Sequence, residues 1–126
     1  MPQAREHTYL RTHKLSGKLL RFALREEDAR VREQAVASKT GRAAKTLVKE
    51  GALRVTFVAL RKGAALQAHQ VAGAVSIHVQ RGRLRVLVDG GAVNLGPGDL
   101  AALGEGVSHS AEAASDCAIL ITAAMS

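Results

Sequence analysis

The sequence predicts an all-β fold, an antiparallel sandwich or barrel, with an N-terminal extension that contains a short helix. Two observations predict it. From residue 43 onward the chain consists of about nine short segments rich in Val, Leu, Ile and Thr, and glycine turns separate them. Apolar and charged residues alternate in segments such as "RGRLRVLVDGG", which is typical of strands with one buried face. We assign residues 1–42 to the extension and 43–126 to the β-domain.

The extension has two parts. Residues 1–18 show no periodicity, and we expect residues 1–15 to be loosely held. Residues 19–38, "LLRFALREEDARVREQAVAS", place four apolar residues at spacings of four, seven and four, which fits one helical face and predicts a helix near 26–37. These residues are Leu20, Leu24, Val31 and Ala35. An apolar cluster at the start of this part is expected to pack against a barrel edge or a partner subunit: Leu19, Leu20, Phe22 and Leu24.

The strands follow in order. We expect them at 45–49, 53–61, 65–71, 74–80, 83–89, 92–95, 99–103, 108–113 and 117–123. The sequence Asp89-Gly90-Gly91 predicts a hairpin turn, because glycine tolerates a positive φ. "LGPGDL", at 95–100, predicts a second tight turn. No internal repeat and no linker indicates a second domain.

Composition excludes some classes of protein. No apolar run approaches the roughly 18–20 residues that a membrane helix needs, so we expect no membrane partner. The polar N-terminus lacks the apolar core of a secretory signal. The single cysteine, Cys117, rules out an internal disulfide, which agrees with a reducing compartment and predicts a cytoplasmic protein.

Positive charge is concentrated in the first part of the chain. Residues 1–50 hold 12 Lys and Arg against 6 Asp and Glu, a net charge of +6, whereas residues 51–126 hold 6 against 5. A basic arm can bind nucleic acid by counterion release. Acidic residues interrupt this arm, however, and Tyr9 and Phe22 are its only aromatic residues for base stacking. We therefore expect a solvated arm rather than a nucleic-acid partner.

The spacing of glycines and histidines resembles the cupin superfamily, and in particular small single-domain bacterial cupins of the RmlC-like jelly-roll type. The first cupin motif runs glycine, five residues, histidine, one residue, histidine, three or four residues, glutamate, six residues, glycine. This chain keeps Gly63, His69 and Gly82 in register. Val71 stands in place of the second histidine, and Val75 in place of the glutamate.

The second cupin motif is kept in the same reduced form. It runs glycine, five residues, proline, one residue, glycine, two residues, histidine, three residues, asparagine. The chain offers Gly98, Gly106 and His109, with Gly104 in place of the proline and Ala113 in place of the asparagine. The resemblance covers roughly residues 43–124 and implies a cupin-type jelly-roll barrel with a site inside its mouth. It implies no particular activity, because one barrel serves many chemistries.

The resemblance, combined with strand alternation, gives a set of candidate ligand-binding residues. If the cupin positions point inward, the residues two apart on the same strand do so as well. The predicted inner site consists of Gln67, His69, Val71, Val75, Ile77 and His109, with Val79 deeper on the same wall. His78 is then expected to face outward.

The metal centre implied by the resemblance is reduced. Cupins that hold a metal usually offer three histidines and one carboxylate, and this chain keeps only His69 and His109. Two imidazoles make a weak site for Zn, Mn, Fe or Ni unless Gln67, His7, His13 or a partner chain completes it. In a mostly apolar pocket, the two rings could instead be hydrogen-bonded through water.

Three functional hypotheses stay open from the sequence. The first is a cupin that binds a small molecule and has a weak or vacant two-histidine metal centre. The second is a metal-dependent enzyme of the dioxygenase or isomerase type, whose site a residue outside the motifs completes. The third is a structural or regulatory module that acts through its basic arm. The sequence does not decide whether the protein is an enzyme, and it names no catalytic residue.

The resemblance also implies a homodimer, and open sheet edges favour it. We expect the pairing edge to come from residues 43–61, where "LRVTFVAL" is long and apolar.

Overall fold

The computed structural model describes residues 14–69 and 72–126, and the side chains of residues 68 and 69 lie outside that description. Within these described residues one helix precedes nine strands, as the sequence predicts. The helix α1 spans Leu24–Ala37, which confirms the helix expected near 26–37. The strands are β1 (Arg42–Glu50), β2 (Leu53–Leu60), β3 (Ala65–His69), β4 (Gly73–Arg81), β5 (Leu84–Val88), β6 (Gly91–Leu95), β7 (Leu100–Leu103), β8 (His109–Ala113) and β9 (Cys117–Met125).

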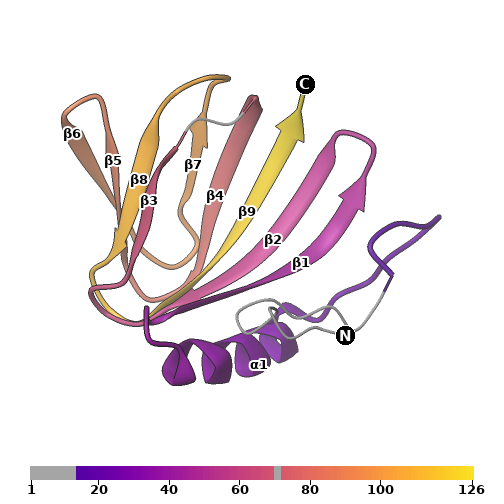
Figure 1. The fold of residues 1–126 in the computed structure, drawn as a ribbon, viewed down its shortest axis with the longest axis horizontal. Coiled ribbons are helices and arrows are strands. Elements are labelled where there is room, and N and C mark those ends of the chain that lie inside the picture. Colours follow the sequence, from indigo (N-terminus) through magenta and orange to yellow (C-terminus); the bar gives the residue numbers. More distant parts are fainter. Residues whose placement is uncertain (1–13, 70–71) are drawn as a thin grey trace.

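The strands form two antiparallel sheets that face each other, as Figure 1 shows. The five-stranded sheet has the order β1-β2-β9-β4-β7, and the four-stranded sheet has the order β3-β8-β5-β6. Consecutive strands therefore often lie in different sheets, so the fold is a jelly roll. The predicted turn at Asp89–Gly91 joins β5 to β6, and Asp89 and Gly90 both have positive φ angles, of 49° and 76°.

The main core lies between the two sheets. Val75, Ile77 and Val79 alternate along β4 and are 5%, 1% and 0% exposed, so the predicted inward face of this strand is confirmed. Apolar side chains from the other strands complete this core, including Val58, Leu60, Leu84, Val86, Ala111, Cys117 and Ile119. Burial is the main stabilising term for such residues, at about 25 cal/mol per Å² of apolar surface.

Helix α1 covers part of the outer face of the five-stranded sheet. In Figure 1 it runs beneath β1 and β2. Its inward side chains and the outward side chains of the sheet form a second core, which we call the outer cluster: Val31, Ala35, Ala43, Leu47, Phe57, Ala59 and Ala118. Phe22 and Leu24 pack against this cluster, but Leu19 is 86% exposed. The expectation that Leu19 is buried was wrong: the chain meets β1 earlier, where the Leu15 carbonyl accepts from the Lys49 N–H, and the Leu19 side chain stays in solvent.

Two ion pairs fasten α1 to the sheet. The Lys45 ammonium of β1 donates to Glu27 Oε1 at 2.6 Å, and this pair is buried. The Arg81 guanidinium, at the end of β4, donates from Nε and Nη2 to the two carboxylate oxygens of Asp28. These hydrogen bonds raise the pKa of Arg81. Helix α1 is thus an integral layer of the fold.

One edge of the five-stranded sheet, β1, falls almost entirely within the predicted range 43–61, but it is not the apolar segment expected there. The apolar segment "LRVTFVAL" is β2, which pairs with β1 on one side and with β9 on the other. It cannot offer an edge to a second subunit, because both of its hydrogen-bonding sides are occupied. The edge strands of this sheet are β1 and β7. β1 is more polar than β2 and ends in Lys49 and Glu50.

Candidate functional site

The two motif histidines lie on neighbouring strands. His69 ends β3 and His109 begins β8, and their Cα atoms are partners in the antiparallel ladder. The backbone therefore brings both residues to the same level of the four-stranded sheet, as the motif spacing predicts. On its other side His109 is the partner of Val88 in β5. The order across the sheet at this level is His69, His109, Val88.

The surroundings of His109 set the chemistry of its ring. The residue is 6% exposed, and its Nδ1 lies 3.2 Å from the carbonyl oxygen of Val107. Because a carbonyl oxygen only accepts, Nδ1 carries the proton in this hydrogen bond. In the neutral ring the lone pair then resides on Nε2, and the same backbone bond is a common way to orient a histidine that binds metal.

The apolar wall near the histidines includes Val75, which the motif names, and further residues that it does not name. Three residues separate His69 from the start of β4, so Val75 lies at the same end of the barrel. Val75 pairs with Leu103 and with Ala123. Half-buried apolar side chains at the margin of the main core also include Val88, Ile121 and Met125. Their strand alternation, in "RLRVLVD" and "CAILITAAM", carried the signal that they face inward.

The other predicted site residues take different positions. Ile77 is almost completely buried in the main core, and Gln67 is exposed. Val71 and the side chain of His69 lie outside the described residues, as do His7 and His13. Gln67, Val71, Val75 and Ile77 remain predicted ligand contacts.

His78 lies on the outer side of the five-stranded sheet, as predicted. It alternates along β4 with the buried Ile77 and Val79, and it is half-buried. Its Nδ1 is 2.6 Å from the side-chain nitrogen of Gln80, which donates to it. This histidine is therefore separated from His109 by the main core and makes a matched control for experiments on the barrel mouth.

The donor set fits a complete metal centre poorly. Among residues 14–67 and 72–126, no group of three or more His, Cys, Asp or Glu side chains is arranged to hold a metal ion. Val75 fills the glutamate position of the motif with an apolar, buried side chain. Structural and catalytic metals normally take three or four protein ligands, so we derive no reaction step through a metal.

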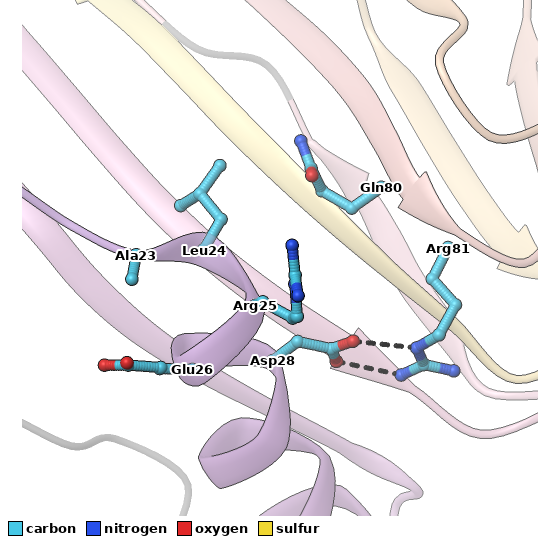
Figure 2. Close-up of a pocket in the computed structure, with 7 residues that line it drawn as sticks. All are labelled: Ala23, Leu24, Arg25, Glu26, Asp28, Gln80 and Arg81. Atoms are coloured by element: carbon cyan, nitrogen blue, oxygen red, sulfur yellow. Dashed lines mark hydrogen bonds and ion pairs between the residues drawn. The ribbon is translucent and has the colours of Figure 1, made fainter.

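A groove of about 660 Å³ lies elsewhere, between the N-terminal turn of α1 and the end of β4. Its lining residues are Ala23, Leu24, Arg25, Glu26, Asp28, Gln80 and Arg81. Figure 2 shows that Asp28 and Arg81 point toward each other, while Glu26 points away from them. Asp28 already neutralises Arg81 in this groove.

No family model and no curated protein matches this chain. Solved structures do. An RmlC-like cupin from Shewanella frigidimarina superposes with a TM-score of 0.65 at 23% identity, over 69% of this chain and 78% of that one. A cupin superfamily protein from Desulfitobacterium hafniense gives 0.66 at 12% identity, over 68% and 78%. The chain has the cupin fold.

The cupin fold also occurs in a larger neighbour. Salicylate 1,2-dioxygenase from Pseudoaminobacter salicylatoxidans superposes with a TM-score of 0.71 at 20% identity, over 79% of this chain. The match spans only 33% of the dioxygenase. At these identities the likeness concerns the fold, and function has to be argued from the site.

In the described part of the chain, no helix is long and apolar enough to cross a membrane.

Proposed function

We propose that the mouth of the barrel binds a small, largely apolar molecule beside His69 and His109. The observation that carries this proposal is the pairing of the two histidines across β3 and β8, with His109 buried beside the apolar wall. Pockets of this kind, apolar with a few converging polar groups, are typical of small-molecule sites. Val75, Val88 and Leu103 would supply the apolar contacts.

A divalent metal would bind weakly at the same place. Because His109 Nδ1 donates to Val107, Nε2 would be its ligand atom, and His69 would supply the second nitrogen. With two protein ligands the metal would exchange readily and be removed by a mild chelator.

Calorimetric titration with Zn²⁺, Mn²⁺, Fe²⁺ and Ni²⁺ tests the metal part of the proposal. We expect weak binding that both His69→Ala and His109→Ala abolish, whereas His78→Ala, on the outer face of the sheet, leaves it unchanged. Equal effects of all three substitutions on metal binding would contradict the assignment of the site to His69 and His109. Tight binding by the natural protein would instead support the alternative, a metal-dependent enzyme of the dioxygenase or isomerase type with a further ligand.

A nuclear magnetic resonance titration with salicylate tests the small-molecule part. Salicylate is chosen as a probe because a salicylate 1,2-dioxygenase shares the fold. Amide signals of Val75, Val88, Leu103 and His109 are expected to shift, whereas those of α1 stay in place. Shifts confined to α1 or to the basic surface would overturn the assignment of the mouth as the binding site.

The protein would act as a homodimer through the part of the outer sheet face that α1 leaves uncovered. Leu100 is 62% exposed there, and its neighbours across β4 and β9, His78 and Leu120, bring no acidic or permanently charged group. Because the chain carries a net charge of +7, two copies repel each other least where an uncharged face meets its own copy.

Light scattering tests the dimer. We expect Leu100→Glu to yield the 13.2 kDa monomer, since a carboxylate would be buried unpaired in the interface. The control is Val93→Glu, which places the same charge at a 55% exposed position of the other sheet and should leave the dimer intact. A natural protein that is monomeric at tens of micromolar would refute this face.

A further inference from the structure

A basic pocket lies at the end of the barrel opposite His109. Two loops form it, the connection from α1 to β1 and the connection from β2 to β3. It encloses about 300 Å³ and is lined by Lys39, Thr40, Gly41, Arg61, Lys62, Gly63 and Ala64. In Figure 1 both loops lie at the bottom of the barrel, whereas the C-terminus lies at the top. The lining contains three cationic side chains and no carboxylate.

Backbone hydrogen bonds fix the two loops to each other and to the barrel. The Arg61 N–H donates to the Gly41 carbonyl at 2.7 Å, and the Gly63 N–H donates to the Ala113 carbonyl at 2.8 Å. Gly41 has a φ of +75°, and a Cβ there would lie 3.4 Å from the Cβ atoms of both Arg61 and Ala64. The loops therefore meet closely at a glycine, so the positions from which the cationic side chains extend are well defined.

Among the described residues, no ion pair neutralises the cations of this pocket. Within the described part of the chain, Lys39, Arg61 and Lys62 form no ion pair, in contrast to Lys45 and Arg81. The nearby carboxylate of Asp116 accepts the backbone N–H of Lys62 at 2.7 Å. Like charges around one concavity repel each other, and an anion bound among them relieves that repulsion.

We propose that this basic pocket binds the terminal phosphate of a small phosphorylated molecule. A phosphate monoester carries a charge of about −1.5 to −2 at neutral pH, whereas each phosphate of a nucleic-acid backbone carries −1, so three cations favour the monoester. Arg61 supplies a planar, forked donor for two phosphate oxygens, and the lysines act as point charges. When Ser38 is the donor in its 2.9 Å hydrogen bond with Thr40, the Thr40 hydroxyl proton can be donated to a phosphate oxygen. Because the pocket is open to solvent, the rest of the molecule can extend outward.

Calorimetric titration with adenosine 5′-monophosphate tests the proposal, with adenosine as the matched probe that lacks a phosphate. We expect the monophosphate to bind, adenosine not to bind, and raised salt to weaken the binding. The variant carrying Lys39→Gln, Arg61→Gln and Lys62→Gln is expected to lose at least about tenfold in affinity. These side chains are exposed, so the variant should keep the thermal unfolding midpoint of the natural protein.

The control variant carries Arg21→Gln, Arg32→Gln and Lys49→Gln, three exposed basic residues outside the pocket. Both variants lower the net charge from +7 to +4. Equal losses in the two variants would overturn the pocket, because the binding would then follow net charge. If the pocket variant unfolds, the single change Lys62→Gln, with Lys49→Gln as control, repeats the comparison.

A further probe separates the two sources of phosphate. An oligonucleotide without terminal phosphates is expected to bind more weakly, per phosphate, than the monophosphate. Tighter binding of the oligonucleotide would overturn the assignment to small phosphorylated molecules and favour a nucleic-acid partner. Binding of adenosine as tight as that of the monophosphate would show that the phosphate is not recognised at all.

Discussion

The buried ion pair between Glu27 and Lys45 makes a quantitative prediction about how α1 is held. The Lys45 side chain is 2% exposed and that of Glu27 is 9% exposed. Removing one partner of a buried pair leaves an uncompensated charge, which typically costs 3–5 kcal/mol. We therefore expect Glu27→Ala to destabilise the protein by about 3 kcal/mol, the lower end of that range, because the vacated side of the pair is the one nearer to water.

Removing the other partner, Lys45, should lower the free energy of unfolding less. After Lys45→Met, the Glu27 carboxylate keeps some solvent and a second cation, since Arg30 Nη1 lies 4.0 Å from Glu27 Oε1. A loss of about 1–2 kcal/mol is expected, within the range for a buried polar group that loses its partner. The double change Glu27→Leu with Lys45→Met should bring stability back to within about 1 kcal/mol of the natural protein, because apolar groups of similar volume replace buried pairs well.

Guanidinium unfolding followed by circular dichroism measures these differences in the free energy of unfolding. Arg30→Ala is the control, since this arginine is 54% exposed and its pairing with Glu27 should contribute less than about 1 kcal/mol. The reasoning is refuted if Glu27→Ala costs under about 1 kcal/mol, or if the apolar double variant is as unstable as Glu27→Ala.

Three further predictions concern the barrel. A Cβ at Gly82 would lie 2.1 Å from a backbone carbonyl oxygen, whereas one at Gly90, with a similar φ of +76°, meets nothing within 4 Å; Gly82→Ala should therefore lower the unfolding midpoint more than Gly90→Ala, and equal effects would contradict the close approach. Burial raises the pKa of the Cys117 thiol from its ordinary value of 9.0 to about 11. The stability that the protein gains by burying the protonated thiol is then complete below pH 9 and is lost as the pH rises through 11. Ellman's reagent at about pH 8 should react with Cys117 only after unfolding, and rapid reaction in the native state would disprove its burial. Val71→His with Val75→Glu should tighten Zn²⁺ binding by at least about tenfold in calorimetry and lower stability without metal; unchanged affinity would show that these positions do not meet the histidines.

The positions of the strands and the helix were predictable because the spacing of their apolar residues follows the period of the element. Val75, Ile77 and Val79 alternate with more polar neighbours, and the structure buries all three. Val31 and Ala35 share one face of α1, and both are buried between the helix and the sheet. In each case the period of the side chains decides which residues face the core.

The sequence did not reveal what α1 packs against. Lys45 occupies an outward-facing position of β1 and would normally be solvated, yet α1 covers it and supplies Glu27 as its partner. Such a pair joins residues 18 positions apart, and no periodicity connects them. Leu19 gave the opposite error, since its hydrophobicity predicted burial and the path of the chain leaves it exposed.

The candidate site was predictable at the level of the backbone. Motif spacing placed His69 and His109 at the same level of the sheet, and their Cα atoms are partners. The hydrogen bond of His109 to Val107 was not predictable, because it depends on how the loop before β8 turns back toward the ring. The basic pocket was missed as well, since Lys39 and Arg61 come together only through the contact between two loops.

Anomalous X-ray diffraction from crystals soaked in Zn²⁺ would show whether His69 and His109 form the centre of the binding site. We expect one partly occupied peak at about 2.0–2.1 Å from Nε2 of both rings, which a mild chelator removes. A peak at His78 with none between the two rings would contradict this assignment, and so would rings that point away from each other.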